Sequence, residues 1–429
     1  MMNMKTILLL VLISIPFFGV AETPLFDSVF YNKTLRIDYI HGGTDSSEFY
    51  ALDEMLEEPH WGGSYTNLID TLEYGHYFFK VNDKATGKTL YSRGYSSLFR
   101  EWQTTKEADT VSRAFYETIV FPYPKNPVEV VFYSRDSMNR FQKSYSLDVN
   151  PDSYFIRPQD RLKFPTFDVM KNGHPSEKVD VAIIPEGYTK DDIGRFIEDC
   201  QRFADKLFLF EPYTQNKEKF NIYGVLAPSA ENGSDVPGEK TYRSTLLNSS
   251  FYTFDSERYC MTTDNKRVRD VASNVPYDQI YILVNAKKYG GGAIYNNYNV
   301  SVNNSEYSAR IFVHEFGHGF AGLGDEYYTS SVAYNDFFSL DAEPWEPNLT
   351  TLIDFNGKWE KLIPEGTPIP TPDTGKYVKQ LGVFEGGGYV AKGVYRPASN
   401  CIMNSLHAEE FCGACKQSIQ QMIDYYTGK

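Results

Sequence analysis

The sequence predicts two folded domains, an all-β sandwich followed by a domain that mixes strands and helices (α/β or α+β). Residues 25–155 contain short β-type runs separated by turn residues, and beyond residue 165 apolar strand-like runs alternate with helical periodicity. The chain of 429 residues is also longer than one hydrophobic core usually supports. We therefore expect a β-sandwich accessory domain over residues 22–155 and a second domain over residues 165–429.

Residues 1–21 have the pattern of a cleavable signal peptide. Lys5 precedes an apolar run over residues 6–13, and the small residues Gly19 and Ala21 lie just before Glu22. The run is too short for a comfortable membrane span, which favours a signal peptide over a membrane anchor. We expect the mature protein to be exported to the periplasm, the cell surface or the medium, without inserting into a membrane.

Net charge and composition restrict the partners. The chain carries a formal net charge of −14, which disfavours binding to nucleic acid or to an anionic membrane surface. Hydrophobic residues make up 41% and aromatic residues 16% of the sequence, enough apolar material for two cores. We therefore expect no nucleic-acid partner.

Strands in the N-terminal domain are predicted from β-forming runs bounded by turns. They cover residues 34–40, 74–81, 89–92, 113–121, 128–133 and 140–147. This pattern favours an antiparallel sandwich, and no helical segment is prominent in it. Three scattered histidines, His41, His60 and His76, are typical of structural or surface positions and not of a ligand set. Residues 150–165, rich in proline and charge, predict a linker.

The second domain begins with a strand, a helix and further strands. Strands are predicted over residues 179–184, 220–226 and 279–284, and a helix over residues 190–210. The strand at 279–284 is apolar throughout, as a central strand should be. Residues 289–295 contain three consecutive glycines, which fits either an edge strand that pairs with an extended peptide or a flexible loop.

The sequence His314-Glu315-Phe316-Gly317-His318 predicts a metal site. Two histidines four residues apart on an α-helix differ by about 40° around the axis and about 6 Å along it, so both imidazoles lie on one face. Glu315, about 100° further round, reaches a water on the metal without being a ligand, which is the arrangement of a zinc hydrolase. The apolar residues 311–313 bury this helix, which disfavours a chance match on a surface helix.

The third ligand is expected just after the helix. Four glycines between residues 317 and 324 allow the chain to reverse, and the first carboxylates beyond them are Asp325 and Glu326. Asp325 is favoured, because it needs the smaller adjustment of the turn. Glu326 would then hydrogen-bond the second nitrogen of a histidine or the loop backbone, although it stays an alternative ligand. One catalytic Zn²⁺ is therefore expected.

Four sequence motifs carry a family resemblance. They are IPEGY at residues 184–188, HEFGHGFAGLGDEY at 314–327, FEGGGY at 384–389, and the run from YRP at 395 to CIM at 401–403. In this combination the sequence resembles the IgA-peptidase-like family of bacterial zinc metallopeptidases, over residues 165–429 and, through TLRIDY at 34–39, over the N-terminal domain. The resemblance implies a metzincin-like fold, one catalytic zinc and hydrolysis of peptide bonds.

The resemblance also suggests roles for residues outside the helix. Met403 lies in a string similar to the Met-turn that underlies the metal in metzincins, but their third ligand falls at the position of Gly324, one residue before Asp325. Tyr395, shortly before the Met-turn, is the candidate oxyanion donor, although metzincins that use a tyrosine for this role place it two residues after the methionine, where this chain has Ser405. The long, loop-rich insertion between Asp325 and Met403 is expected to form the lower wall of the cleft, with Tyr389 among its candidate lining residues.

Two hypotheses of function follow. The first is an exported zinc endopeptidase that acts on a polypeptide or glycoprotein, with His314, His318 and Asp325 as ligands and Glu315 as general base. The alternative is a non-catalytic surface protein that binds glycans or proteins and has a structural zinc site. Glu315 argues against the alternative, because a structural site needs no general base and uses a fourth protein ligand.

The five cysteines are expected to be structural. Cys412 and Cys415 form a CxxC, and Cys401 lies shortly before them, so a disulfide from Cys401 to one of the two is favoured over redox catalysis in an exported protein. Cys200 and Cys260 are separate. An odd number of cysteines leaves at least one thiol unpaired.

Overall fold

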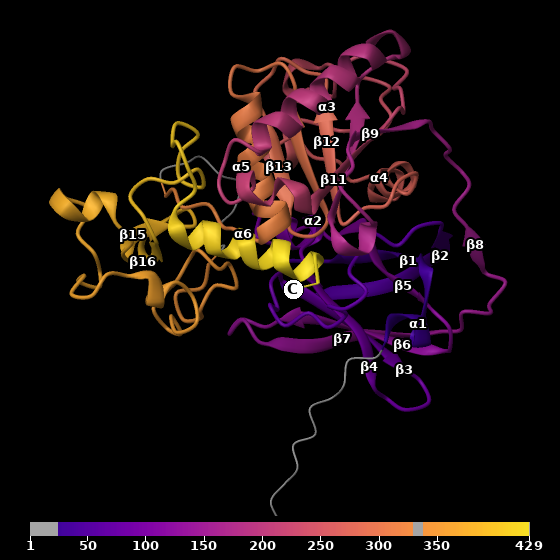
Figure 1. The fold of residues 1–429 in the computed structure, drawn as a ribbon, viewed down its shortest axis with the longest axis horizontal. Helices are drawn as coiled ribbons and strands as arrows, with labels where there is room; N and C mark the ends of the chain where they lie inside the picture. Colours follow the sequence, from indigo (N-terminus) through magenta and orange to yellow (C-terminus); the bar gives the residue numbers. More distant parts are fainter. Residues whose placement is uncertain (1–24, 329–337, 429) are drawn as a thin grey trace, which may run out of the picture.

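The computed structural model describes residues 25–328 and 338–428 (Figure 1). The predicted signal peptide at residues 1–21 lies outside the described residues. Within these ranges, no helix has both the length and the hydrophobicity needed to cross a bilayer. The molecule is an α+β protein with several sheets and an N-terminal β domain.

Two four-stranded sheets build the N-terminal domain. One has the order β5-β1-β2-β8 and the other β4-β3-β6-β7, and all neighbours are antiparallel except β2 and β8. Inward-facing side chains of both sheets, such as Ile37 and Phe79, share one core, so the sheets pack face to face as predicted. The strands are β1 (Phe30–Gly43), β2 (Glu48–Glu58), β3 (Tyr77–Asp83), β4 (Thr89–Tyr95), β5 (Arg113–Pro124), β6 (Val128–Arg135), β7 (Phe141–Val149) and β8 (Ile156–Pro158).

Three features of this domain differ from the sequence prediction. Strand β2 was not predicted, because its many acidic residues hide the β pattern. Strand β8 lies inside the predicted linker and extends the first sheet. The domain also contains two helices, α1 (Phe26–Val29) and α2 (Leu98–Gln103), and the side chain of Ser97 caps α2 by accepting from the Arg100 N–H.

A six-stranded sheet forms the centre of the second domain. Its order is β13-β14-β12-β10-β11-β9, with parallel pairing in the middle and antiparallel strands at both edges. Strand β12, which was predicted to be central, is buried along its whole length. The strands are β9 (Thr166–Met170), β10 (Val179–Glu186), β11 (Phe220–Val225), β12 (Gln279–Val284), β13 (Gly291–Ile294) and β14 (Tyr298–Val302).

Helices cover both faces of this sheet. On one face, Val181 and Ile183 of β10 contact a core shared with α3 (Ile193–Leu207), α5 (Ser308–Ala321) and α6 (Gly413–Tyr426). On the other face, Ala182 and Ile184 contact α4 (Asn265–Ala272) and also helix α2 of the N-terminal domain. Because α2 is part of this second core, the two domains are packed together through apolar side chains.

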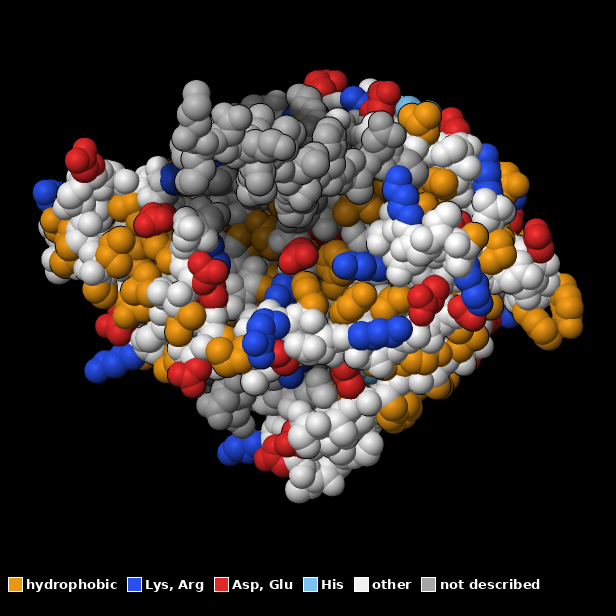
Figure 2. Space-filling model, turned by 90° about the horizontal axis from the view of Figure 1, so that it is seen from below, with side chains coloured by type: hydrophobic (Ala, Val, Ile, Leu, Met, Phe, Trp, Pro, Cys, Tyr) orange, Lys and Arg blue, Asp and Glu red, His pale blue; other side chains and the backbone are white. Residues whose placement is uncertain are grey.

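The remaining elements are short. Strands β15 (Phe384–Gly387) and β16 (Val390–Arg396) form a hairpin that stands at the side of the molecule in Figure 1, near the start of α6. Short 3₁₀ helices span Pro175–Glu177, Lys190–Asp192, Thr214–Lys219, Pro237–Glu239, Thr253–Asp255, Glu360–Leu362 and Gly375–Lys379. Figure 2 shows the side of the N-terminal sheets, where acidic and basic side chains alternate with apolar ones.

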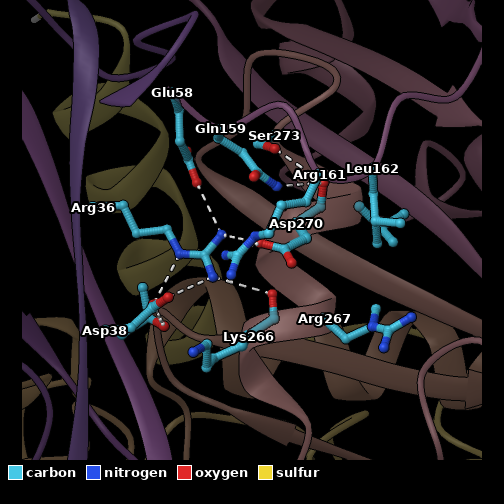
Figure 3. A network of polar contacts seen from close by, with 12 residues as sticks. Arg36, Asp38, Glu58, Gln159, Arg161, Leu162, Lys266, Arg267, Asp270 and Ser273 are labelled. Carbon is cyan, nitrogen blue, oxygen red and sulfur yellow. Dashed lines mark hydrogen bonds and ion pairs between the residues drawn. The ribbon is translucent and has the colours of Figure 1, made fainter. Parts of the chain in front are cut away.

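A buried ion network joins the two domains (Figure 3). Arg36 of β1 donates to both carboxylate oxygens of Asp38 at 2.8 and 2.7 Å, and to Asp270 of α4 at 2.8 Å. Arg161 donates to the same oxygen of Asp270 at 3.0 Å, and Glu58 lies 3.5 Å from Arg36. Asp38 and Glu58 are buried with Arg36 and depend on it for neutralisation, whereas Asp270 also pairs with Arg161.

We expect Arg36→Met to lower the free energy of unfolding by about 3–5 kcal/mol, because it leaves the buried carboxylates of Asp38 and Glu58 without their paired cation. The control is Lys33→Met on the same strand. Lys33 pairs with Glu57 at the surface, with side-chain exposures of 47% and 30%, and such pairs contribute about 1 kcal/mol or less. Denaturant unfolding of both variants measures the difference, and equal losses would contradict the role of the network.

Candidate metal centre

Helix α5 carries the predicted metal motif and is fixed by its apolar face. Phe312, Phe316 and Phe320 recur at four-residue spacing and pack into the core, where the Phe312 ring stacks on Tyr281 at 3.9 Å between centroids. The helix ends at Gly322, whose φ of 65° places it in the left-handed region that ends many helices. The two histidines therefore project from a rigid element.

Three donor atoms surround one point. His314 Nε2 and His318 Nε2 are 3.1 Å apart, and Asp325 Oδ1 lies 3.1 Å from the first and 3.3 Å from the second. Ligands bonded to zinc at about 2.0–2.1 Å in a tetrahedron are separated by roughly 3.3 Å, which matches this triangle. Asp325 Oδ1 is buried and accepts no hydrogen bond. The donor set therefore fits a tetrahedral metal with one open position.

Backbone carbonyls orient both imidazoles. His314 Nδ1 donates to the Ile402 carbonyl at 3.0 Å, and His318 Nδ1 donates to the Leu323 carbonyl at 2.5 Å. A proton on Nδ1 leaves the lone pair of each Nε2 directed at the shared point, as metal-ligating histidines require. Glu326 was expected to hydrogen-bond either the second nitrogen of a histidine or the loop backbone, and the first alternative is not formed, because the two carbonyls bond these nitrogens.

The β15–β16 hairpin holds Asp325 in place. The Tyr389 hydroxyl donates to Asp325 Oδ2, which leaves Oδ1 for the metal. The Gly388 N–H donates to the Asp325 carbonyl at 2.8 Å, and the Tyr389 N–H donates to the Tyr327 carbonyl at 3.0 Å. Gly388 and Tyr389 have φ of 55° and 66°, as in a tight hairpin turn, and a positive φ is uncommon for tyrosine. The turn therefore aims Tyr389 at the carboxylate.

The structure shows why the third ligand is the carboxylate of Asp325, one residue later than in metzincins. A side chain at Gly324 has no room, because its Cβ would lie 2.5 Å from Leu349 Cδ1. Asn348 also clamps this residue, accepting from the Gly324 N–H at 2.7 Å and donating to the Gly324 carbonyl at 2.9 Å. Asp325 is thus the residue that turns toward the histidines, whereas Glu326 points away from them. The imidazoles of His318 and His314 hold the pKa of Asp325 well below its usual range, although burial acts to raise it.

Glu315 lies beside the triangle and faces the sheet edge. A Cβ on Gly291 would lie 3.4 Å from Glu315 Oε1, so the carboxyl group lies against β13. Burial raises the pKa of Glu315, and the charges of His314 and His318 partly offset this effect. A carboxyl group with a raised pKa beside a metal site is suited to accept and return a proton.

A cavity of about 1060 Å³ opens in front of these residues. Both domains line it: His76, Arg100 and Arg135 come from the N-terminal domain, and Arg258 and Tyr289 come from the second. The N-terminal domain thus forms one wall of the cavity and is more than a remote accessory. The sequence showed no signal for this role of the N-terminal domain, because the residues that the domain contributes to the cavity are far apart along the chain.

The glycine-rich segment is an edge strand whose outer side is partly covered. Strand β13 pairs with β14, but Gly291 also accepts from the Cys260 N–H at 3.3 Å and donates to the Arg258 carbonyl at 3.2 Å. A Cβ on Gly292 would lie 2.5 Å from Met261 Sδ. These glycines therefore admit the 258–261 segment, so the expected pairing with an extended peptide is blocked at Gly291.

The two remaining predicted residues differ in their placement. Met403 is buried beneath α5, where a Cβ on Gly317 would lie 2.9 Å from its Sδ. Tyr395 lies on β16, its N–H donates to the Thr350 carbonyl at 2.8 Å, and its ring packs on the core. Among the described residues that line the cavity, Tyr395 is absent. The structure therefore does not place Tyr395 at the cavity, and its role as oxyanion donor stays a prediction.

The cysteines also differ from prediction. All five are free and buried. Cys401 Sγ and Cys415 Sγ are 3.8 Å apart, well beyond a disulfide bond of about 2.05 Å. The expected bridge is therefore not formed in this structure.

Comparison with known proteins gives a family. Residues 167–378 and 373–423 match the family model described as IgA Peptidase M64, and residues 25–146 match the one described as Peptidase M64 N-terminus. No curated protein matches the chain. The matches confirm the resemblance drawn from the sequence motifs.

Tyr389→Phe should weaken metal binding roughly 10–100-fold, because the loss of a hydrogen bond to a ligating carboxylate loosens its orientation. Competition with a chelator measures the affinity. Tyr395→Phe is the matched control, since this tyrosine lies outside the cavity. If both variants bind metal equally well, Tyr389 does not position Asp325.

Proposed function

The chain belongs to the IgA peptidase M64 family, and on that premise we propose that it is an exported zinc-dependent endopeptidase with Glu315 as general base. Membership makes it a metallopeptidase with a polypeptide substrate. Zinc dependence and the role of Glu315 are supported above all by the triangle of His314 Nε2, His318 Nε2 and Asp325 Oδ1, with Glu315 beside it. Export is supported by the signal-peptide pattern of residues 1–21.

A metzincin-like arrangement of the second domain is part of the proposal. It is supported by the position of Met403 beneath α5 and by the antiparallel edge strand β13 next to the helix. The site differs from metzincins in its third ligand, which is Asp325 and not the residue at position 324. Asn348 and Leu349 pack against Gly324 and leave no room for a side chain there.

The protein's own residues then perform the proton transfers. When bound, zinc supplies an acidified water and polarises the scissile carbonyl. Glu315 accepts the proton of the attacking water and returns it to the leaving amine, and its raised pKa suits both steps. Tyr389 and the Ile402 and Leu323 carbonyls keep the ligands oriented throughout.

The alternative of a non-catalytic surface protein with a structural zinc is less well supported. Structural zinc sites are closed by four protein ligands. Among the described residues, the group around the two histidines contains three ligands, and it faces a cavity. An open position beside the half-buried carboxyl group of Glu315 favours catalysis.

Glu315→Gln should reduce hydrolysis of a casein-like substrate at least 10²–10⁴-fold, roughly the contribution of a general base, while the metal stays bound. His318→Ala should lose both activity and the metal of this site, because it removes a ligand. Metal analysis and rate measurement on the same preparations test both. A Glu315→Gln enzyme with a near-normal rate would overturn the assignment of the base.

A further inference from the structure

A second group of metal-binding side chains lies behind the first. Glu326, Cys401, Cys412 and Cys415 are all buried, and one ligand atom from each lies within 4.8 Å of the others. Cys415 Sγ lies 3.1 Å and Cys412 Sγ 3.8 Å from Glu326 Oε1, and Cys401 Sγ lies 3.8 Å from Cys415 Sγ. We call these four residues the cysteine cluster.

The spacing of the cysteine cluster matches a tetrahedral ion. Thiolates bonded to zinc at about 2.3 Å are separated by roughly 3.8 Å, and a thiolate and a carboxylate oxygen by roughly 3.5 Å. The distance between Cys401 and Cys415 agrees with the first value, and the two distances to Glu326 lie on either side of the second. The cluster therefore has the size of a zinc site.

Glu326 supplies an independent observation. Its carboxyl group is fully buried, Oε1 accepts from Asn348 Nδ2 at 3.0 Å, and Oε2 accepts no hydrogen bond. Within residues 25–328 and 338–428, no lysine or arginine forms an ion pair with it. A buried carboxylate without a positive partner is strongly disfavoured, and a bound cation would satisfy it.

The local backbone favours thiolates. Cys412 is the N-cap of α6 and Cys415 lies in its first turn, so both sulfurs lie at the positive end of a 14-residue helix. The Cys412 N–H donates to Cys401 Sγ at 3.2 Å. A CxxC at a helix start with one more cysteine is a common zinc-binding pattern.

We propose that Glu326, Cys401, Cys412 and Cys415 bind a second Zn²⁺ with a structural role. Four protein ligands close the coordination shell, so this ion has no open position for water or substrate. A disulfide is the competing use of these thiols. It would consume two cysteines and leave the buried Glu326 without a positively charged partner.

The two sites are linked through the backbone. Asp325 of the first site and Glu326 of the second are consecutive, as are Cys401 and Ile402, whose carbonyl orients His314. The Glu326 N–H also donates to the Met403 carbonyl at 2.8 Å. A metal bound by the cysteine cluster would therefore fix the turn at 401–403 and, through it, two ligands of the first site.

The experiment removes the first site and observes the second directly. Wild-type protein should contain two zinc ions per chain, and His318→Ala should retain one. X-ray absorption at the zinc edge of His318→Ala should show sulfur ligands at about 2.3 Å. A variant without zinc, or one with only nitrogen and oxygen ligands, would overturn the proposal. Because this measurement needs no intact first site, failure of the proposed endopeptidase function would leave it unaffected.

Cysteine variants identify the ligands. Cys412→Ser should lose the sulfur-bound zinc, whereas Cys260→Ser, a buried cysteine outside the cluster, should keep it. If Cys412→Ser does not fold, the absorption spectrum of His318→Ala decides alone. Peptide mapping without reductant is the opposing test, because a disulfide from Cys401 to Cys412 or Cys415 in zinc-replete protein would exclude the site.

Discussion

Three electron-rich atoms held about 3.2 Å apart in a buried site are the constraint on which this structure depends. Without a cation, two imidazole lone pairs and a carboxylate oxygen at these distances repel one another or compete for protons. The surrounding protein opposes that repulsion. The phenylalanines of α5 fix the helix, the carbonyls of Leu323 and Ile402 fix the imidazoles, and Tyr389 fixes Asp325. The folded protein holds the ligands in this unfavourable arrangement, and metal binding then stabilises it.

The need to hold these donor atoms together explains the long insertion between Asp325 and Met403. Asn348 and Leu349 shape the turn at Gly324, and the β15–β16 hairpin bonds the backbone of Asp325 and Tyr327. The returning chain brings Cys401 beside the cysteines of α6, directly behind the histidines. The insertion therefore builds the inner side of the site, and the N-terminal domain contributes the opposite wall of the cavity.

Local sequence patterns made part of the fold and of the metal site predictable. The spacing of His314 and His318 on a helix, the strands β10 to β12 and the N-terminal β domain all follow from periodicity within one segment. Residues whose roles depend on distant partners were missed or misplaced. Glu326 was expected to bond a histidine nitrogen or the loop backbone, but the Leu323 and Ile402 carbonyls bond the histidine nitrogens. Helix α2 was missed because its apolar residues serve the core of the other domain.

Anomalous diffraction at the zinc absorption edge, on crystals grown without chelator, tests the central claim most directly. The account predicts a strong peak bounded by His314 Nε2, His318 Nε2 and Asp325 Oδ1, with a non-protein ligand toward Glu315. A zinc-replete protein with no peak among these atoms, or with Glu315 itself as a ligand, would contradict it.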